Sequence, residues 1–395
     1  MRFPLLIGII SMTTSMISSN MRKGIYILFG LIALFASCEK SASDLSEGQP
    51  IYLSVRVPEM SLTKVPYEGS APTTSNPLNV DVWASTTSAV FKNDNKNGSA
   101  ADGHIVAIHT GGHFQSGDPQ LLSQAVYPPP VNTGGSGAPV YFVSMYPQNN
   151  WGTNDDGTIA TYKFSGCEDL MFAKQVQGAY DTDSQGEVVT NSPTLAFEHL
   201  LTRFTVRMGI QLGTGENLLD VQNAWGPVTE MKIQAYNKQG GSLEGLNTVT
   251  IDLSKGAAFN YADDLTFSYN NGQNSIGSSL SLYSTDTDTQ FPSAGGYALT
   301  EIKNSNVPEV AYTMCAPVNA TDDSHEYVIT VTTEKRGEQE VILDLRESDS
   351  ALFTGDTRGK HFGVTLKFRK GSAIATVAKV EEWENGGYGS GEIED

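Results

Sequence analysis

The sequence predicts an all-β protein, and three observations carry this prediction. Short runs of alternating apolar residues recur along the chain from residue 51 onward. Turn residues, mainly Gly, Asn, Asp and Pro, separate these runs. Helical periodicity is almost absent after residue 40. About a dozen short strands of this kind favour β-sandwiches, and nothing suggests repeating helix-strand units.

The N-terminal region is expected to be a signal sequence. Met21, Arg22 and Lys23 precede twelve apolar residues, Gly24–Phe35. As a helix these residues would span only about 18 Å, too short for a bilayer core of ~30 Å. We therefore interpret residues 1–37 as a signal region whose true start is Met21.

Cys38 follows two small residues, and the segment LFASC (34–38) resembles a lipobox. That resemblance implies lipid acylation of Cys38 and an outer-membrane lipoprotein. A plain signal peptide with an incidental cysteine is the other interpretation. The polar residues 38–49 then predict a flexible tether.

The strands that the alternation predicts follow in chain order. In the first of them, Ile51, Leu53, Val55 and Val57 would face one side and enter a core. The full set is Ile51–Val57, Leu78–Ala84, His104–Thr110, Val140–Tyr146, Thr158–Phe164, Phe204–Ile210, Glu230–Tyr236, Thr248–Leu253, Tyr327–Thr333, Glu340–Leu345, Gly363–Phe368 and Ala373–Trp383.

A domain boundary is expected near Thr190–Pro193, where a polar loop precedes a dense apolar run. It divides the body into two tandem β-sandwich domains, residues 50–193 and residues 194–395, both of ordinary size. Cys167 and Cys315 are too few for a disulfide framework, so we expect free thiols.

Composition excludes one class of partner. The chain has 25 Lys and Arg against 44 Asp and Glu, a net charge of −19. Nucleic-acid binding needs clustered cations, and the only dense cluster is Arg203 and Arg207. We therefore expect no nucleic-acid partner.

No motif predicts catalysis or a cofactor. His104, His109 and His113 form the most metal-like feature, but His104 and His109 would fall on opposite faces of a strand. His199 lies in an apolar run beside Glu198, and we interpret it as a core or interface histidine. The segment 181–192 imitates a calcium loop but lacks the final acidic ligand. We expect no metal, no cofactor and no enzyme.

Five segments in order resemble the signature blocks of the fimbrillin-like family. They are YFVSMYP (141–147), DLMFAK (169–174), LAFEHLLTRFTV (195–206), GKHFGVTLKF (359–368) and ATVAKVEEWENGG (375–387). The resemblance implies two transthyretin-like sandwiches and a subunit of a type V pilus, a cell-surface fimbria that supports adhesion. Its implied partners are other pilin subunits, the outer membrane through the lipid, and a cell-surface protease.

In that family a strand of a neighbouring subunit replaces the first strand after proteolysis. The replaced strand here would be Ile51–Val57, and the cleavage site would be Lys64, the cation of the following loop. The family's protease prefers Arg, so Lys64 departs from the pattern. The role as stalk, tip or anchor subunit stays open. The alternative function is a surface glycan-binding lipoprotein that uses exposed aromatic side chains as sugar platforms, for which Trp83, Trp151, Trp225 and Trp383 are candidates, although no loop clusters several of them.

Overall fold

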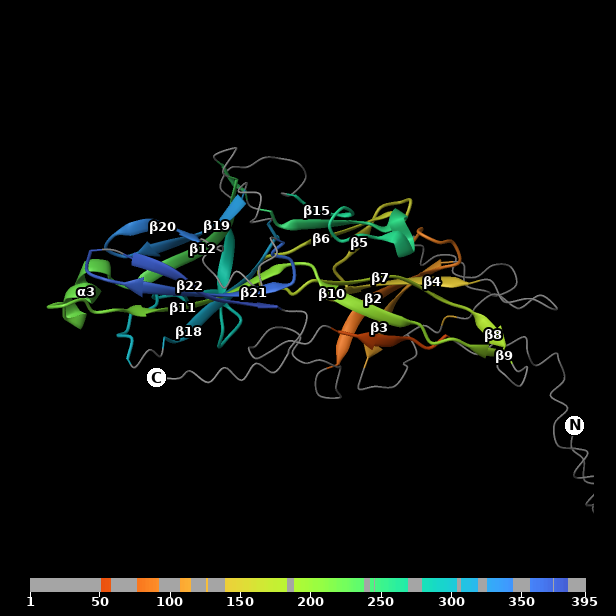
Figure 1. Ribbon diagram of the computed structural model, residues 1–395, viewed down its shortest axis with the longest axis horizontal. Coiled ribbons are helices and arrows are strands. Elements are labelled where there is room, and N and C mark those ends of the chain that lie inside the picture. Colours follow the sequence, from red (N-terminus) through yellow and green to blue (C-terminus); the bar gives the residue numbers. More distant parts are fainter. Residues whose placement is uncertain are drawn as a thin grey trace, which may run out of the picture. The chain divides into compact units, whose positions relative to one another are not determined.

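Strands make up nearly all of the regular structure in the computed structural model, which confirms the all-β prediction (Figure 1). The structure describes residues 51–57, 77–91, 107–114, 126, 139–182, 188–237, 242–244, 246–268, 279–303, 307–318, 325–343, 356–371 and 373–382. All of them belong to one compact unit, Gln49–Asp395. Among them, no helix has both the length and the apolar character needed to span a membrane.

The first sheet has six strands, all from the N-terminal half of the chain. Its strands are β1 (Ser54–Arg56), β2 (Leu78–Ser85), β3 (Ala107–Phe114), β4 (Val140–Tyr146), β7 (Met171–Gly178) and β10 (Thr194–His199). Their order in the sheet is β1-β10-β7-β4-β2-β3. The β1–β10 pair is parallel and the other pairs are antiparallel. Strand β1 therefore ends the sheet on one side.

The second sheet has ten strands, all from the C-terminal half. They are β11 (Thr202–Ile210), β12 (Val228–Asn237), β13 (Ser242–Glu244), β16 (Leu280–Ser284), β17 (Gln290–Phe291), β18 (Glu309–Cys315), β19 (His325–Thr333), β20 (Gly337–Leu343), β21 (Lys360–Phe368) and β22 (Ala373–Glu382). The main path runs β20-β19-β12-β16-β18-β11-β21-β22, with β13 beside β12 and β17 beside β16. The end strands β20 and β22 contact each other, which shows that the sheet curls.

A third sheet of four strands draws on both halves. It contains β5 (Gly152–Thr153), β6 (Ile159–Lys163), β14 (Thr248–Asp252) and β15 (Leu265–Ser268), in the order β15-β14-β6-β5. A short 3₁₀ helix, η2 (Leu253–Ala258), follows β14. A separate hairpin joins β8 (Tyr180–Thr182) to β9 (Val188–Thr190).

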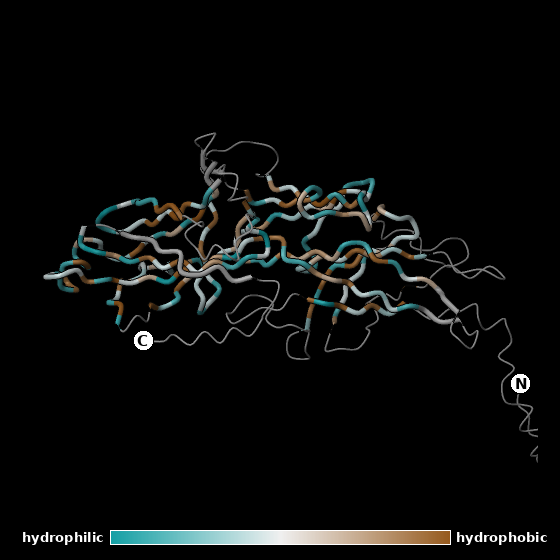
Figure 2. Tube along the Cα trace, viewed as in Figure 1, coloured by the Kyte–Doolittle hydropathy of each residue, from teal (hydrophilic) through white to brown (hydrophobic). Residues whose placement is uncertain are grey.

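Two clusters of buried apolar side chains lie on opposite faces of the six-stranded sheet. Along β2, Val80 and Val82 belong to one cluster, whereas Trp83 belongs to the other. This division follows from the strand period of two, which turns successive side chains to opposite faces. Figure 2 shows hydrophobic residues, in brown, interspersed with hydrophilic residues, in teal, along the chain.

The helix α3 (Leu218–Trp225) is the one α-helix in the described residues, and the sequence did not predict it. The Asn217 side chain caps it by accepting a hydrogen bond from the Asp220 N–H (2.9 Å). Val221 and Trp225 face the core. A helix of eight residues makes little more than two turns, so its periodicity is hard to recognise in sequence.

Candidate functional site

Strand β1 is the candidate site, because it is a short edge strand with deeply buried side chains. It pairs with β10 over three residues, Ser54 with Thr194 through Arg56 with Ala196. The Ser54 N–H donates to the Pro193 carbonyl (3.1 Å), and the Ser54 and Thr194 hydroxyls lie 2.7 Å apart. Few ladder hydrogen bonds therefore hold a strand whose main attachment is apolar.

The four residues of this strand that were predicted to face a core differ in how deeply they are buried. Ile51 and Leu53 are 0% exposed and Val57 is 4% exposed. Val55 is partly buried and packs against the same cluster. Alternation accounts for this arrangement, since Arg56 between Val55 and Val57 is exposed.

A glycine on β7 makes room for the start of this segment. A Cβ atom built on Gly178 would lie 2.9 Å from Ile51 Cδ1 and 3.3 Å from a ring carbon of Phe142. The Ile51 N–H donates to the Val126 carbonyl (2.8 Å). Ile51 thus fills a position that any side chain at residue 178 would obstruct.

The other two predicted site residues, Cys38 and Lys64, lie outside the described residues. So does His104 of the histidine group. No group of three or more His, Cys, Asp or Glu in the described part of the chain could hold a metal ion. His109 Nε2 lies 3.0 Å from Asp81 Oδ1, and the His109 ring stacks on Trp83 at 4.3 Å.

Sequence reasoning missed two pairs of histidine and aspartate, of which His199 with Asp169 is fully buried and His109 with Asp81 has a partly exposed histidine. His199 Nδ1 lies 2.8 Å from Asp169 Oδ1, and both side chains are buried. His199 therefore has a carboxylate partner, Asp169, in addition to its chain neighbour Glu198. Strand pairing explains both pairs, because β7 lies beside β10 and β3 beside β2.

The two thiols in the described part are free, and they differ in exposure. Cys315 is buried and Cys167 is half-buried. Burial raises the pKa of both thiols, which keeps them protonated near neutral pH. Neither thiol is an activated nucleophile.

The tryptophans bear on the glycan-binding alternative. Trp83, Trp151 and Trp225 are at most 5% exposed, so none can stack on a bound sugar. Trp383 lies outside the described residues.

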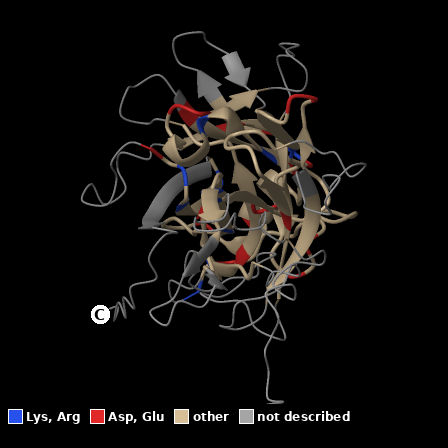
Figure 3. Cartoon of the chain, turned by 90° about the vertical axis from the view of Figure 1, so that its right-hand side faces the viewer, with Lys and Arg blue, Asp and Glu red and all other residues tan. Residues whose placement is uncertain are grey.

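Acidic residues lie at several turns and strand ends (Figure 3).

Comparisons with known proteins return structural similarity only. No protein-family model and no curated protein sequence matches the chain. A proposed cell adhesion protein from Bacteroides uniformis is 16% identical over 85% of this chain and 99% of its own, with a TM-score of 0.42. A fimbrial protein from Bacteroides vulgatus is 12% identical over 85% and 99%, with a TM-score of 0.33. The fimbrial anchor protein Mfa2 from Porphyromonas gingivalis is 10% identical over 84% and 98%, with a TM-score of 0.36. These neighbours are adhesion and fimbrial proteins, and at such scores they add no argument about function.

Proposed function

We propose that the protein is a structural subunit of a cell-surface fimbria of the type V class, assembled by donor-strand exchange. It belongs to the fimbrillin-like family in this proposal and forms two tandem β-sandwiches, residues 50–193 and 194–395. It is exported as a lipoprotein whose Cys38 carries the lipid in the outer membrane. Other pilin subunits are its partners, and a surface protease prepares it for assembly.

The observation that carries the proposal is the contrast between the burial and the backbone pairing of β1. Ile51, Leu53 and Val57 are almost completely buried, yet the strand pairs with β10 over only three residues. Burying three such side chains stabilises the fold by roughly 4–9 kcal/mol as an upper bound. A typical folded domain has a net stability of only about 5–15 kcal/mol. A subunit without β1 therefore needs another strand in its place.

A strand from a second subunit can replace β1, because it can pair with the exposed sheet edge and cover the apolar cluster. Removal of β1 leaves the backbone groups of β10 unpaired on one side and uncovers the apolar cluster beneath. An extended segment of a second subunit satisfies both needs, with alternate side chains in the vacated positions. A head-to-tail exchange whose rotation does not close builds an open fibre rather than a ring, and the proposal is of that kind.

The test compares the full mature chain with a protein that begins at Val65, as cleavage after Lys64 would leave it. The shortened protein should form oligomers or bind a synthetic peptide of residues 49–57. The control peptide carries Leu53→Asp and Ile51→Asp and should not bind. A shortened protein that stays monomeric, melts at an unchanged temperature and binds neither peptide would refute strand exchange.

The lipid anchor is tested separately with Cys38→Ala. We expect the variant to leave the membrane fraction and to lose labelling by a radioactive fatty acid, whereas Cys167→Ala should retain both. Normal acylation of Cys38→Ala would refute the anchor. N-terminal sequencing of assembled surface protein distinguishes a cleaved subunit, which begins at Val65, from an anchor that keeps Cys38.

A further inference from the structure

A hairpin from the second half of the chain completes the sandwich of the first half. We call residues 247–268, which comprise β14, η2 and β15, the clasp. Strand β14 pairs with β6 over five residues, Thr248 with Lys163 through Asp252 with Ile159. Two further backbone hydrogen bonds extend the ladder at its ends, Phe164 N–H to the Asn247 carbonyl (2.9 Å) and Leu253 N–H to the Thr158 carbonyl (2.8 Å).

Side chains of the clasp also reach the six-stranded sheet. The rings of Phe259 and Tyr261 pack edge-on against Phe172 of β7, with centroids 5.0 and 6.1 Å away. The Tyr261 hydroxyl donates to the Phe172 carbonyl (3.0 Å). Gly256 at φ +52° approaches Gln175, so closely that a Cβ there would lie 3.0 Å from Gln175 Oε1. The clasp thus covers the face of the sheet opposite to the β1 cluster.

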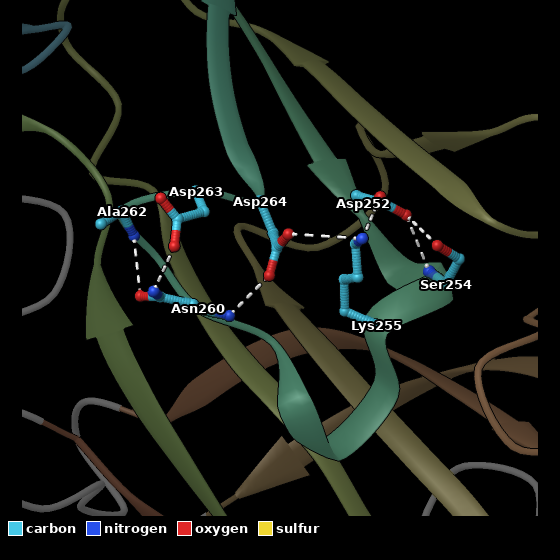
Figure 4. Close-up of polar contacts among 7 residues, drawn as sticks. All are labelled: Asp252, Ser254, Lys255, Asn260, Ala262, Asp263 and Asp264. Atoms are coloured by element: carbon cyan, nitrogen blue, oxygen red, sulfur yellow. Dashed lines mark hydrogen bonds and ion pairs between the residues drawn. The ribbon is translucent and has the colours of Figure 1, made fainter.

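The turn of the clasp is held by its own polar contacts (Figure 4). Asp252 accepts hydrogen bonds from the backbone N–H and the hydroxyl of Ser254. The Asp264 carboxylate accepts from the Asn260 N–H (2.7 Å). Lys255 Nζ lies 3.9 Å from a carboxylate oxygen of both Asp252 and Asp264. These contacts within the turn add to those that it makes with β7.

A loop of the first half makes the reciprocal contact. The Gly166 carbonyl accepts hydrogen bonds from the Met314 N–H (2.7 Å) and the Thr313 hydroxyl (3.3 Å) of β18. The Tyr283 hydroxyl of β16 donates to Ser165 Oγ (3.1 Å). Each half of the chain therefore supplies an element that is hydrogen-bonded to the other half.

We propose that the clasp makes the six-stranded and ten-stranded sheets one cooperative unit, in which neither sheet opens while the other stays folded. Opening the six-stranded sheet alone would uncover the rings of Phe259 and Tyr261 and break the hydrogen bond from Tyr261 to the Phe172 carbonyl. Opening the ten-stranded sheet alone would release Met314 and Thr313 from Gly166, and would disturb Arg358, which precedes β21 and lies over the Tyr261 ring at 4.9 Å. Both sheets together would then resist a force that is applied to either of them.

Native-state hydrogen exchange of the full chain tests this proposal with Ile251→Ala. Ile251 is buried on β14, whereas Thr250 on the same strand is half-buried, so Thr250→Ala is the matched control. We expect Ile251→Ala to accelerate the slowest amides of β4 and of β12 by the same factor, about 30-fold or more. Thr250→Ala should change both by less than about 3-fold.

Tyr261→Phe provides a milder variant if Ile251→Ala does not fold, since it removes only the hydroxyl that bonds the Phe172 carbonyl. We expect equal acceleration of about 5-fold or more in β4 and β12. Acceleration confined to one sheet, with either variant, would overturn the proposal. The proposal would also be overturned if, in the unaltered protein, the opening constants of the slowest amides differed tenfold between the two sheets.

Discussion

At the scale of single residues, Gly166 shows how one backbone position joins two parts of the fold. Its φ of +109° lies in the region that only glycine adopts readily. A Cβ atom there would lie 2.8 Å from Thr313 Oγ1 and 3.3 Å from the Ser281 carbonyl oxygen. Both the conformation and the space therefore require glycine.

Gly295 provides a matched control for this position, because its φ of +107° is nearly the same and a Cβ there meets nothing within 4 Å. Gly295→Ala should cost only the backbone strain, about 1–2 kcal/mol. Gly166→Ala should cost about 1–3 kcal/mol more, because Thr313 or the loop must also move. Urea denaturation of both variants measures the difference, and equal costs would contradict the steric account.

Tyr162 on β6 gives a prediction about alkaline pH. Burial, and after it the negative charge of Glu168, raise the pKa of Tyr162 from 10.0 to about 12. Between these values the unfolded chain loses the phenol proton while the folded chain keeps it, so stability falls as pH rises from 10 to 12. In Tyr162→Phe this loss should be smaller by at most about 3 kcal/mol. Denaturation curves at pH 9 to 12 check this, and an unchanged pH slope would contradict it.

At the scale of elements, β1 combines little backbone pairing with deep burial. Leu53→Asn should lower the stability by about 3 kcal/mol or more, because it removes apolar contacts and buries a polar amide. Arg56→Asn, on the exposed side of the same strand, should change it by less than about 0.5 kcal/mol. Thermal unfolding followed by circular dichroism measures both. Similar melting temperatures for the two variants would show that β1 is not part of the cooperative core.

Sequence alternation predicted several strands at or close to their observed bounds. The range predicted as Val140–Tyr146 is that of β4, and Thr248–Leu253 matches β14 within a residue. Strand β18 was missed although it is buried to the same degree as β4, with six of seven residues buried in each, so burial alone does not separate the predicted strands from the missed ones. The partner of His199 was missed because Asp169 lies thirty residues away and only pairing of β7 with β10 joins them. Pairing between distant segments leaves no local signal.

At the scale of the whole molecule, the same limitation applies to the clasp. Alternation predicted β6 and β14 as strands but could not indicate that they pair with each other. The division into residues 50–193 and 194–395 stays a prediction. Strand pairing nevertheless places residues 248–268 beside β6, in a sheet that both parts of the chain build. If the chain were divided after residue 193, β6 would therefore be separated from β14, the strand with which it pairs.

The large sequence separation between β6 and the clasp has a consequence for biosynthesis. Thr248 must be available before Lys163 finds its partner, roughly 90 residues after β6 leaves the ribosome. At 5–20 residues per second this delay is roughly 5–20 s. Throughout that time β6 lacks β14 and β15, so the third sheet stays incomplete. We expect nascent chains arrested at residue 240 to be digested by protease within residues 140–200, and chains arrested well beyond residue 382 to resist.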